Sequence, residues 1–422
     1  MDKVVVTGLG FVSSIGNSIP EVLDHLRHLR HGFEAFPSLN GEVCPPKLYG
    51  SIKEFETIGW DPEDWIGPAR YKVARSHLKS MSPNVFYSYF STLDALADAS
   101  LELSQVSNRR TGLYSASAGS SGMLHHHLQR LNELGITRCS PYGVVSSTVG
   151  TINFNLGAFL GIQGSVCGMA SACASSAHAL GFAYDAITSG RQDRMIVIGA
   201  EDCNRESLLP FAGMLALSMS ADPGRASCPF DVDRSGFVGS GGAATLILES
   251  EAVARARGAK IYAAFKGWGE AGDGHSSVMS HPQGEGLVAS MQNALAAAQL
   301  EREEIDYVNA HATSTPVGDL SEIRALKQMF FGSGGPCPAV SSTKALTGHT
   351  LSMAAALEAG ICCLAIHEGF MPGSAHVQKL DPECEGLNIL RETNNERPHH
   401  VISNSSGFGG ANVSLIFSEW ND

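Results

Sequence analysis

The sequence predicts an α/β protein built from two similar halves. Short runs rich in β-branched residues alternate with longer runs rich in alanine and leucine, a pattern typical of strands that alternate with helices. A glycine-rich turn that leads into an apolar strand occurs twice, as Ser235-Gly-Phe-Val-Gly-Ser-Gly-Gly-Ala-Ala-Thr-Leu-Ile-Leu248 and as Ser406-Gly-Phe-Gly-Gly-Ala-Asn-Val-Ser-Leu-Ile-Phe417. With 422 residues, 43% of them hydrophobic, the chain can bury the core of one large domain or of two fused ones.

The expected elements follow the apolar pattern along the chain. Strands are expected at Val4–Val6, Met195–Ile198, Ala244–Leu248, Ile261–Phe265, Tyr307–Asn309 and Val413–Phe417. Helices are expected at Tyr87–Leu101, Ser175–Thr188, Val288–Leu300, Ser321–Phe330 and Ser352–His367. Three clusters of glycine, serine and alanine are expected to form tight turns where backbone segments approach closely: Ser115–Gly122, Ser235–Gly242 and Ser403–Ala411.

The two glycine-rich turns are preceded by similar segments. Roughly 60 residues before each turn, small residues open an expected helix, once around Cys173 and once at Thr347–Leu357. This repeated order predicts a duplicated α/β unit, divided into residues 1–250 and 251–422, whose two matched helix N-termini converge on one site. Chance similarity is the alternative, because turns that lead into strands are common.

Composition narrows the possible environments and partners. The net charge of −13 argues against nonspecific binding to nucleic acid. The nearest approach to a membrane span, Met353–Ile366, is short and carries Glu358, so no membrane segment is expected. Ten cysteines without a CxxC pair, and an N-terminus without a signal-peptide pattern, predict reduced thiols in a cytoplasmic protein.

Cys173 is the candidate nucleophile. It lies in Met169-Ala-Ser-Ala-Cys-Ala-Ser-Ser-Ala-His178, where small residues lead into an expected helix. A thiol in the first turn of a buried helix would be shifted towards thiolate by the unpaired N–H groups and the helix dipole. Taken alone, the segment favours a cysteine that only fills the core, as most free cysteines do.

Other polar residues interrupt apolar context at strand ends. Asn309-Ala-His-Ala-Thr-Ser-Thr-Pro-Val-Gly-Asp-Leu-Ser-Glu322 places His311 after an expected strand, and Val340-Ser-Ser-Thr-Lys-Ala-Leu-Thr-Gly-His349 brings Lys344 close to His349. Singly, a histidine at a strand end is more often structural, and a loop lysine usually lies at the surface. Together with Cys173 they indicate a functional site, because such residues gather where loops meet strand ends.

This set suits acyl transfer followed by carbon–carbon bond formation. An activated thiol can accept an acyl group as a thioester. A malonyl thioester that loses carbon dioxide gives an enolate, which N–H donors from two neutral histidines can stabilise. Lys344 could hold a histidine in place, with Glu322 or Asp319 neutralising its charge. No metal-ligand spacing is present, and neither a metal nor a resident cofactor is expected.

At these motifs the sequence resembles β-ketoacyl–acyl-carrier-protein synthases of the group I/II type, within the thiolase superfamily. The resemblance runs from Val5-Val-Thr-Gly-Leu-Gly-Phe-Val-Ser-Ser-Ile-Gly16 to Ser403-Asn-Ser-Ser-Gly-Phe-Gly-Gly-Ala-Asn412. It implies a thiolase-like fold of duplicated halves with layered α-β-α-β-α architecture. It further implies that Cys173 is acylated and that His311 and His349 promote decarboxylation. Lys344 would organise the site, with Glu322 alone or Glu322 together with Asp319 as its partner.

The same resemblance implies further residues and partners. Phe408 matches the gating phenylalanine, whose N–H would form an oxyanion hole with that of Cys173. Thr313 and Thr315 match hydroxyls that contact phosphopantetheine, the arm on which acyl carrier protein presents its substrates. A basic cluster resembles the family's carrier-protein docking patch, although a solvated helix face is the alternative: Arg70, Lys72 and Arg75, with Lys79 nearby. A homodimer or a heterodimer is implied as the oligomeric state.

Three departures from the family pattern affect the expected pocket. Ala312 replaces the usual glycine, Ser406 replaces a large aromatic ring, and Leu215 stands where many members carry other residues. Gly-Ser-Gly-Gly at 239–242 is closer to the synthase I type. Fatty acid synthesis is the expected role, and a specialised polyene or polyketide pathway is the alternative. A degradative thiolase and a noncatalytic chain-length partner are less consistent with the motifs.

Overall fold

A mixed sheet of 11 strands runs through the computed structural model, which describes residues 3–35, 46–331 and 337–421. Its spatial order is β11-β10-β9-β12-β13-β8-β1-β7-β6-β4-β5. These strands are β1 (Val4–Val12), β4 (Thr111–Ala116), β5 (Val166–Met169), β6 (Arg194–Glu201), β7 (Gly242–Ser250), β8 (Ala263–Gly272), β9 (Tyr307–Asn309), β10 (Ala339–Ser341), β11 (Asn388–Ile389), β12 (His400–Gly407) and β13 (Ala411–Ser418). A separate two-stranded sheet pairs β2 (Phe33–Ala35) with β3 (Leu48–Gly50).

The helices alternate with these strands along the chain. They are α1 (Ile19–Arg27), α2 (Arg75–Leu78), α3 (Pro83–Asp98), α4 (Leu103–Val106), α5 (Ser121–Leu134), α6 (Thr151–Phe159), α7 (Ser175–Thr188), α8 (Arg205–Leu208), α9 (Pro223–Ala226), α10 (Glu251–Ala256), α11 (Glu285–Ala298), α12 (Pro316–Phe330), α13 (Lys344–Thr347) and α14 (Ala354–Glu368). This alternation confirms the predicted α/β class.

The strand pairing repeats itself in the two halves of the sheet. In the first half β1 pairs antiparallel with β7, β7 antiparallel with β6, and β6 parallel with β4, which pairs parallel with β5. In the second half β8, β13, β12, β9 and β10 follow in the same order with the same directions. The halves join where Val4–Val6 of β1 pairs with Ala263–Phe265 of β8. The duplicated architecture is confirmed, whereas the boundary between residues 250 and 251 stays a prediction.

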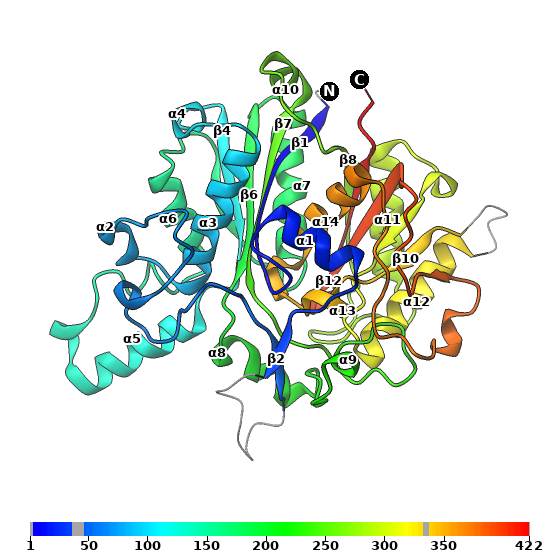
Figure 1. Ribbon diagram of the computed structural model, residues 1–422, viewed down its shortest axis with the longest axis horizontal. Coiled ribbons are helices and arrows are strands. Elements are labelled where there is room, and N and C mark those ends of the chain that lie inside the picture. The colour runs from blue at the N-terminus through cyan, green and yellow to red at the C-terminus, as the bar shows by residue number, and fades with distance from the viewer. Residues whose placement is uncertain (1–2, 36–45, 332–336, 422) are drawn as a thin grey trace.

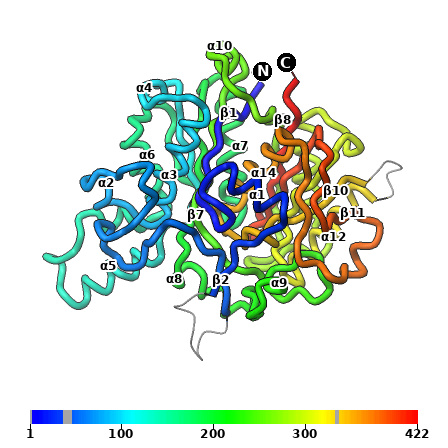
Figure 2. Tube along the Cα trace, in the orientation of Figure 1, coloured from blue at the N-terminus to red at the C-terminus, as the bar shows by residue number. Residues whose placement is uncertain are grey.

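The elements form alternating layers. Figure 1 shows α3 and α6 outside one half of the sheet, α7 and α14 between the halves, and α11 and α12 outside the other half. The trace in Figure 2 follows the chain from the first half, in blue and green, to the second, in yellow to red. The two middle helices therefore belong to different halves of the chain and bring their N-termini together in the core.

The middle helix α14 is almost entirely buried. The helical stretch Leu351–Glu368 is long and apolar enough to pass a length-and-composition test for a membrane span, but 89% of it is buried inside the protein. A core helix of a globular domain meets the same test. Its only charged residue before the C-terminal turn is Glu358, which is buried and ion-paired inside the protein.

All six predicted strands and all five predicted helices are present. Helix α7 and strand β9 have the predicted bounds, and the other nine elements have shifted ends. Two of the predicted turn clusters are partly wrong. Ser115–Gly122 begins inside β4, and Ser403–Ala411 supplies five of the eight residues of β12. Backbone pairing with β9 and β13 on both sides holds these small polar residues in β12. The side chain of Asn404 is also hydrogen-bonded, since its Oδ1 accepts from Ser414 Oγ on the neighbouring strand at 2.8 Å.

Candidate active site

The two glycine-rich turns each hold the functional segment of the opposite half. The backbone of Val238–Ser240, from the first half, brackets His349: His349 N donates to Val238 O at 2.8 Å, and Ser240 N donates to His349 O at 3.1 Å. Gly407, from the second half, packs against the Cys173 turn so closely that a Cβ there would lie 3.2 Å from Cys173 N. This crossed arrangement brings the two predicted helix N-termini to one site.

Cys173 lies at the start of α7 but outside its first turn. The helix begins at Ser175 with Ala174 as its N-cap, so Cys173 is one residue before the cap. Ala172 has a φ of 49°, in the left-handed region that side chains rarely adopt. This sharp turn directs the thiol into the site rather than along the helix, which corrects the predicted position of Cys173 inside the first turn.

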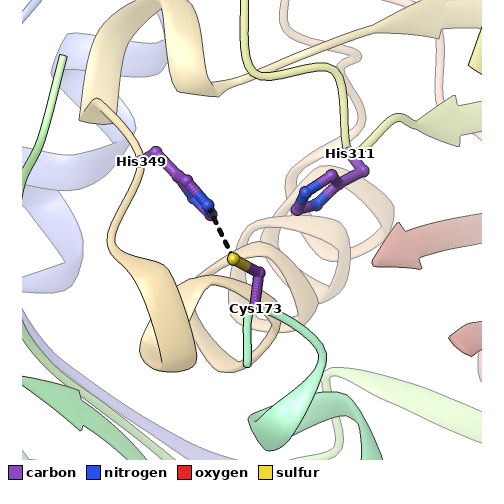
Figure 3. Close-up of side chains that lie close together, drawn as sticks. All are labelled: Cys173, His311 and His349. Atoms are coloured by element: carbon purple, nitrogen blue, oxygen red, sulfur yellow. Dashed lines mark hydrogen bonds between the residues drawn. The ribbon is translucent and has the colours of Figure 1, made fainter. Parts of the chain in front are cut away.

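Cys173, His311 and His349 converge from three different elements (Figure 3). His349 Nε2 lies 3.1 Å from Cys173 Sγ, and the two imidazole rings stand edge to face with their centroids 5.4 Å apart. One ligand atom from each of the three side chains lies within 4.8 Å of the other two. The Nδ1 atoms of both histidines are buried and lack a hydrogen-bond partner within the described chain. The site therefore presents a sulfur and two ring nitrogens to one small volume.

Burial determines the charge state of this triad. It raises the pKa of the Cys173 thiol to about 12, although the positive charge of Lys344 acts in the opposite direction. The expectation that the helix N-terminus favours a resting thiolate is therefore wrong, because desolvation outweighs it. Burial, assisted by Lys344, holds the pKa of His311 and of His349 well below the usual range, so both imidazoles are neutral, as predicted for N–H donors.

Lys344 is ion-paired with Glu358, not with either predicted acid. Its Nζ contacts Glu358 Oε1 from α14, and both side chains are almost fully buried. Burial raises the pKa of Glu358 to about 7, while Lys344 lowers it. The predicted pairing of Lys344 with Glu322 or Asp319 is thus corrected: Glu358 approaches from the central helix, one turn beyond the helix start.

The two predicted acids hold the backbone of neighbouring segments instead. Glu322 accepts hydrogen bonds from the N–H groups of His311 at 3.0 Å and Ala312 at 2.7 Å, and from Asn404 Nδ2 at 3.2 Å. Its buried carboxyl, whose pKa burial raises, feels the charge of Lys344 without contacting it. Asp319 lies 3.6 Å from Arg234 Nε and accepts from the N–H of Phe230. Glu322 therefore supports the His311 segment directly.

A largely apolar cavity of about 550 Å³ opens onto the triad. Thr313 and Thr315 line it with their hydroxyl oxygens 3.1 Å apart, at the start of α12. Phe408 lies at its edge, 38% exposed, with its ring 5.9 Å from that of Phe211. The other apolar lining residues include Met214, Leu215, Phe237, Val278, Met279, Leu287 and Val317. The cavity has the shape and polarity to receive an extended, mainly apolar substrate beside the thiol.

Two of the three departures from the family pattern line the cavity, and the third lies behind it. Ser406 lines the cavity, and its Oγ donates to Asn412 Oδ1 at 2.7 Å, so a bonded hydroxyl occupies the place of the family's ring. Leu215 is 79% exposed at the lining, with a left-handed φ of 54°. Ala312 is buried and contributes its N–H to Glu322.

The predicted docking cluster lies apart from the cavity lining. Arg70 pairs with Asp94 at 2.7 Å, and Arg75 pairs with Glu63. Lys72 is exposed beside them. Neighbouring carboxylates therefore partly neutralise two of the three cations of the predicted docking cluster.

The triad also has the composition of a metal site, since a thiol and two imidazoles are common ligands. The buried positive charge of Lys344 acts on all three groups and opposes a divalent cation there. Metal-binding histidines also usually donate their second N–H to an acceptor, which neither Nδ1 has among the described residues. The donor set therefore fits nucleophile and hydrogen-bond chemistry better than metal binding.

Sequence reasoning missed Glu358, Asn404 and Phe237. The ring of Phe237 stands edge to face on His349 with centroids 5.1 Å apart, and Asn404 bonds to Glu322. Only Glu358 had a usable signal. It is a lone carboxylate in an otherwise apolar helix, and a buried charge of that kind requires a partner.

Fold and site together define a condensing enzyme of thiolase-like architecture with a Cys-His-His centre. The chain matches the family models of the β-ketoacyl synthase N-terminal domain over residues 1–254 and C-terminal domain over residues 262–378, and it belongs to this family. It is 38% identical to 3-oxoacyl-[acyl-carrier-protein] synthase 1 of Haemophilus influenzae, with both chains covered completely.

Two solved ketosynthase structures agree with this family assignment. A β-ketoacyl synthase from Burkholderia phymatum superposes with a TM-score of 0.91 at 31% identity, covering both chains completely. The ishigamide ketosynthase/chain length factor superposes with a TM-score of 0.88 at 28% identity, again over both full chains. The predicted family, fold and enzyme class are confirmed.

Proposed function

We propose that the protein joins an acyl chain held on Cys173 to a malonyl unit carried on the phosphopantetheine of acyl carrier protein, in fatty acid synthesis. The convergence of Cys173 Sγ with two neutral imidazoles at one apolar cavity carries the proposal. The family membership and the resemblance to 3-oxoacyl-[acyl-carrier-protein] synthase 1 support it.

In the first half-reaction, Cys173 Sγ attacks the carbonyl carbon of an acyl thioester. The S–C bond to the enzyme forms, the bond to the carrier sulfur breaks, and the thiol proton of Cys173 ends on the departing carrier thiol. His349 Nε2–H, 3.1 Å from the sulfur, stabilises the thiolate as it forms, and the charge of Lys344 does the same at longer range.

In the second half-reaction, a malonyl thioester loses its carboxylate as carbon dioxide. The electron pair of the broken C–C bond moves into the enolate, whose oxygen accepts hydrogen bonds from the N–H groups of His311 and His349. The enolate carbon then attacks the acyl carbonyl on Cys173. The new C–C bond releases the cysteine sulfur, which takes up a proton. Thr313 and Thr315 are placed to hold the carrier arm during this step.

Mass spectrometry and a condensation assay test the proposal. Wild-type protein incubated with acyl–acyl-carrier protein should gain the acyl mass on Cys173, and Cys173→Ala should not. His311→Ala and His349→Ala should acylate but form no 3-oxoacyl product from malonyl–acyl-carrier protein. Condensation by the Cys173→Ala variant at the wild-type rate would refute the assignment.

The proposed carrier partner is acidic, and the cluster Arg70, Lys72 and Arg75 is its proposed docking site. Because Arg70 and Arg75 already have carboxylate partners, Lys72 is the cation most available to a new one. Lys72→Glu should raise KM for the carrier-bound substrate about tenfold, at unchanged kcat. The KM for a pantetheine thioester should stay the same, and an equal rise for both substrates would argue against docking at Lys72.

A cytoplasmic homodimer is the proposed assembly. Among the described residues, β5 ends the sheet and pairs with β4 alone, and Val166 on it is 42% exposed. Phe154 of α6, which packs against β5, is an exposed apolar side chain that extends this surface. The same half of the fold carries further exposed apolar side chains on α5: Leu124, Leu128, Leu131 and Leu134. An exposed edge strand with an apolar surround favours pairing with a second copy about a twofold axis.

A further inference from the structure

A second chain of hydrogen-bonded side chains lies beside the Cys173 turn. Ser171 Oγ is 2.7 Å from His178 Nδ1, and His178 Nε2 is 2.9 Å from Glu270 Oε2. Ser171 precedes the nucleophile by two residues, His178 is on the first turn of α7, and Glu270 is on β8. None of the three lines the cavity, and the condensation chemistry does not use them.

The imidazole of His178 joins the other two side chains. The Glu270 carboxylate accepts the Nε2–H of His178. On the other side of the ring, Nδ1 lies within hydrogen-bond distance of two oxygens, Ser171 Oγ at 2.7 Å and Ala174 O at 3.2 Å. Phe182, stacked on the imidazole at 6.0 Å, and Trp268, edge-on at 6.3 Å, hold the ring in this orientation. Ser171 is thereby tied to β8 through a histidine of fixed orientation.

The segment fixed in this way is strained. Ala172 has a φ of 49°, in the left-handed region where the Cβ of a non-glycine residue approaches the following carbonyl oxygen too closely. Around it, Ser171 N donates to Ser175 Oγ at 2.8 Å, and Ala174 N donates to Ser171 O at 3.1 Å. Gly407 packs on the other side of the turn, with its added Cβ only 2.7 Å from Ser171 O. The turn is thus held between Gly407 and the bonded Ser171 side chain.

The same bonds connect the turn to the strands of the second half. Glu270 lies opposite Val413 in the ladder between β8 and β13, and β13 follows directly on Phe408–Gly410. The orientation of Cys173 is therefore coupled to the strand pair next to the segment that carries Phe408.

We propose that Ser171, His178 and Glu270 are positioning residues that hold Cys173 Sγ in line for attack on the acyl carbonyl. These residues act through the turn at Ala172, not on the substrate. Their proposed role rests on the proposed function of Cys173 as the acylated group. His311 and His349 are held by other contacts. Loss of Ser171, His178 or Glu270 should therefore slow acylation and spare decarboxylation.

The test separates the two half-reactions. The acylation rate of Cys173 by acyl–acyl-carrier protein is followed by intact mass, and carbon dioxide release from malonyl–acyl-carrier protein is followed in parallel. Ser171→Ala and His178→Ala should acylate about 10- to 100-fold more slowly, with carbon dioxide release within about twofold of wild type. Glu270→Gln, which keeps an oxygen acceptor, should recover most of the rate lost in Glu270→Ala.

Asp185→Ala is the matched control. Asp185 Oδ1 accepts from Trp268 Nε1 at 3.2 Å, so it also links α7 to β8, but farther from the nucleophile. It should leave acylation within about twofold of wild type. Unchanged acylation in both Ser171→Ala and His178→Ala overturns the proposal, as does an equal loss of both half-reactions. Failure of the proposed function is distinguishable from failure of the positioning proposal, because Cys173 of the wild-type protein would then not be acylated at all.

Discussion

The ionisation of Cys173 is the residue-scale property on which acylation depends. Burial raises its pKa to about 12 and Lys344 lowers it, so the thiolate fraction should rise about tenfold per pH unit from pH 7 to pH 10. The rate of alkylation of Cys173 by iodoacetamide, followed by peptide mass, should rise with the same slope and show no plateau below pH 10.

Lys344→Met should make this alkylation about tenfold slower at each pH, because removing the positive charge raises the pKa further. The partly exposed Cys337, in the second half of the fold, serves as an internal control in the same digest, and its alkylation rate should not respond to the substitution. A plateau near neutral pH in the wild type would show that the resting group is a thiolate.

The ion pair between Lys344 and Glu358 should be costly to break from one side. Both side chains are almost fully buried, so Glu358→Ala leaves an ammonium group without its contacting carboxylate. We expect a loss of about 3–5 kcal/mol, measured as a lower midpoint of urea unfolding. The double variant Lys344→Met with Glu358→Leu removes both charges and should recover most of the loss while remaining inactive. A single variant as stable as wild type would contradict the buried charge pair.

Residue chemistry was predictable from the sequence where the local pattern carries it. Cys173, His311 and His349 each interrupt a small-residue or apolar context at a strand or helix end, and they do meet. The partner of Lys344 was not predictable from spacing. Glu322 and Asp319 are nearer to His311 in sequence, whereas Glu358 meets Lys344 only because α13 and α14 follow one another around a tight turn. The pKa of Cys173 depends on burial by several segments of the chain, so the sequence around Cys173 alone does not reveal it.

At the scale of elements, the contact between the end of β12 and the Cys173 turn is the most constrained. A Cβ on Gly407 would lie 2.7 Å from Ser171 O and 3.2 Å from both Cys173 N and Ala174 N, so the backbone must shift. Gly407→Ala should therefore reduce kcat/KM for condensation about 10- to 100-fold, because it displaces the nucleophile. Gly272→Ala is the matched control, since nothing lies within 4 Å of its added Cβ, and its activity should stay near wild type. Equal activity of the two variants would show that the turn tolerates the shift.

Apolar and alanine-rich elements were predicted well, and strand segments rich in serine, asparagine and glycine were not. Helix α7 and strand β9 have the predicted bounds, since each is a continuous apolar or alanine-rich run. The Ser403–Ala411 segment looked like a turn because serine, asparagine and glycine prefer turns in isolation. In the fold, β12 lies between β9 and β13, and paired backbone on both sides outweighs that local preference.

At the scale of the whole molecule, the duplication explains why the site lies where it does. Each half contributes a glycine-rich turn that holds the functional segment of the other half, Val238–Ser240 on His349 and Gly407 on the Cys173 turn. The N-termini of α7 and α14 are further joined by Ala356 N, which donates to Ser176 Oγ at 3.0 Å. Neither half alone can hold Cys173 and His349 at 3.1 Å, so catalysis requires both.

The proposed dimer gives the last test at this scale. If the whole of β5 pairs with its copy about a twofold axis, Val166 of each chain lies opposite Met169 of the other, and Val166→Glu places an unpaired carboxylate at each end of the shared ladder. Light scattering should give this variant the mass of one chain, whereas the wild-type protein should have twice that mass. Phe331→Glu, which changes an exposed ring at the C-terminal end of α12, in the other half of the fold, should remain dimeric. A Val166→Glu protein with the wild-type mass would show that the copies associate elsewhere, because an edge-to-edge ladder is opposed by an unpaired charge buried within it.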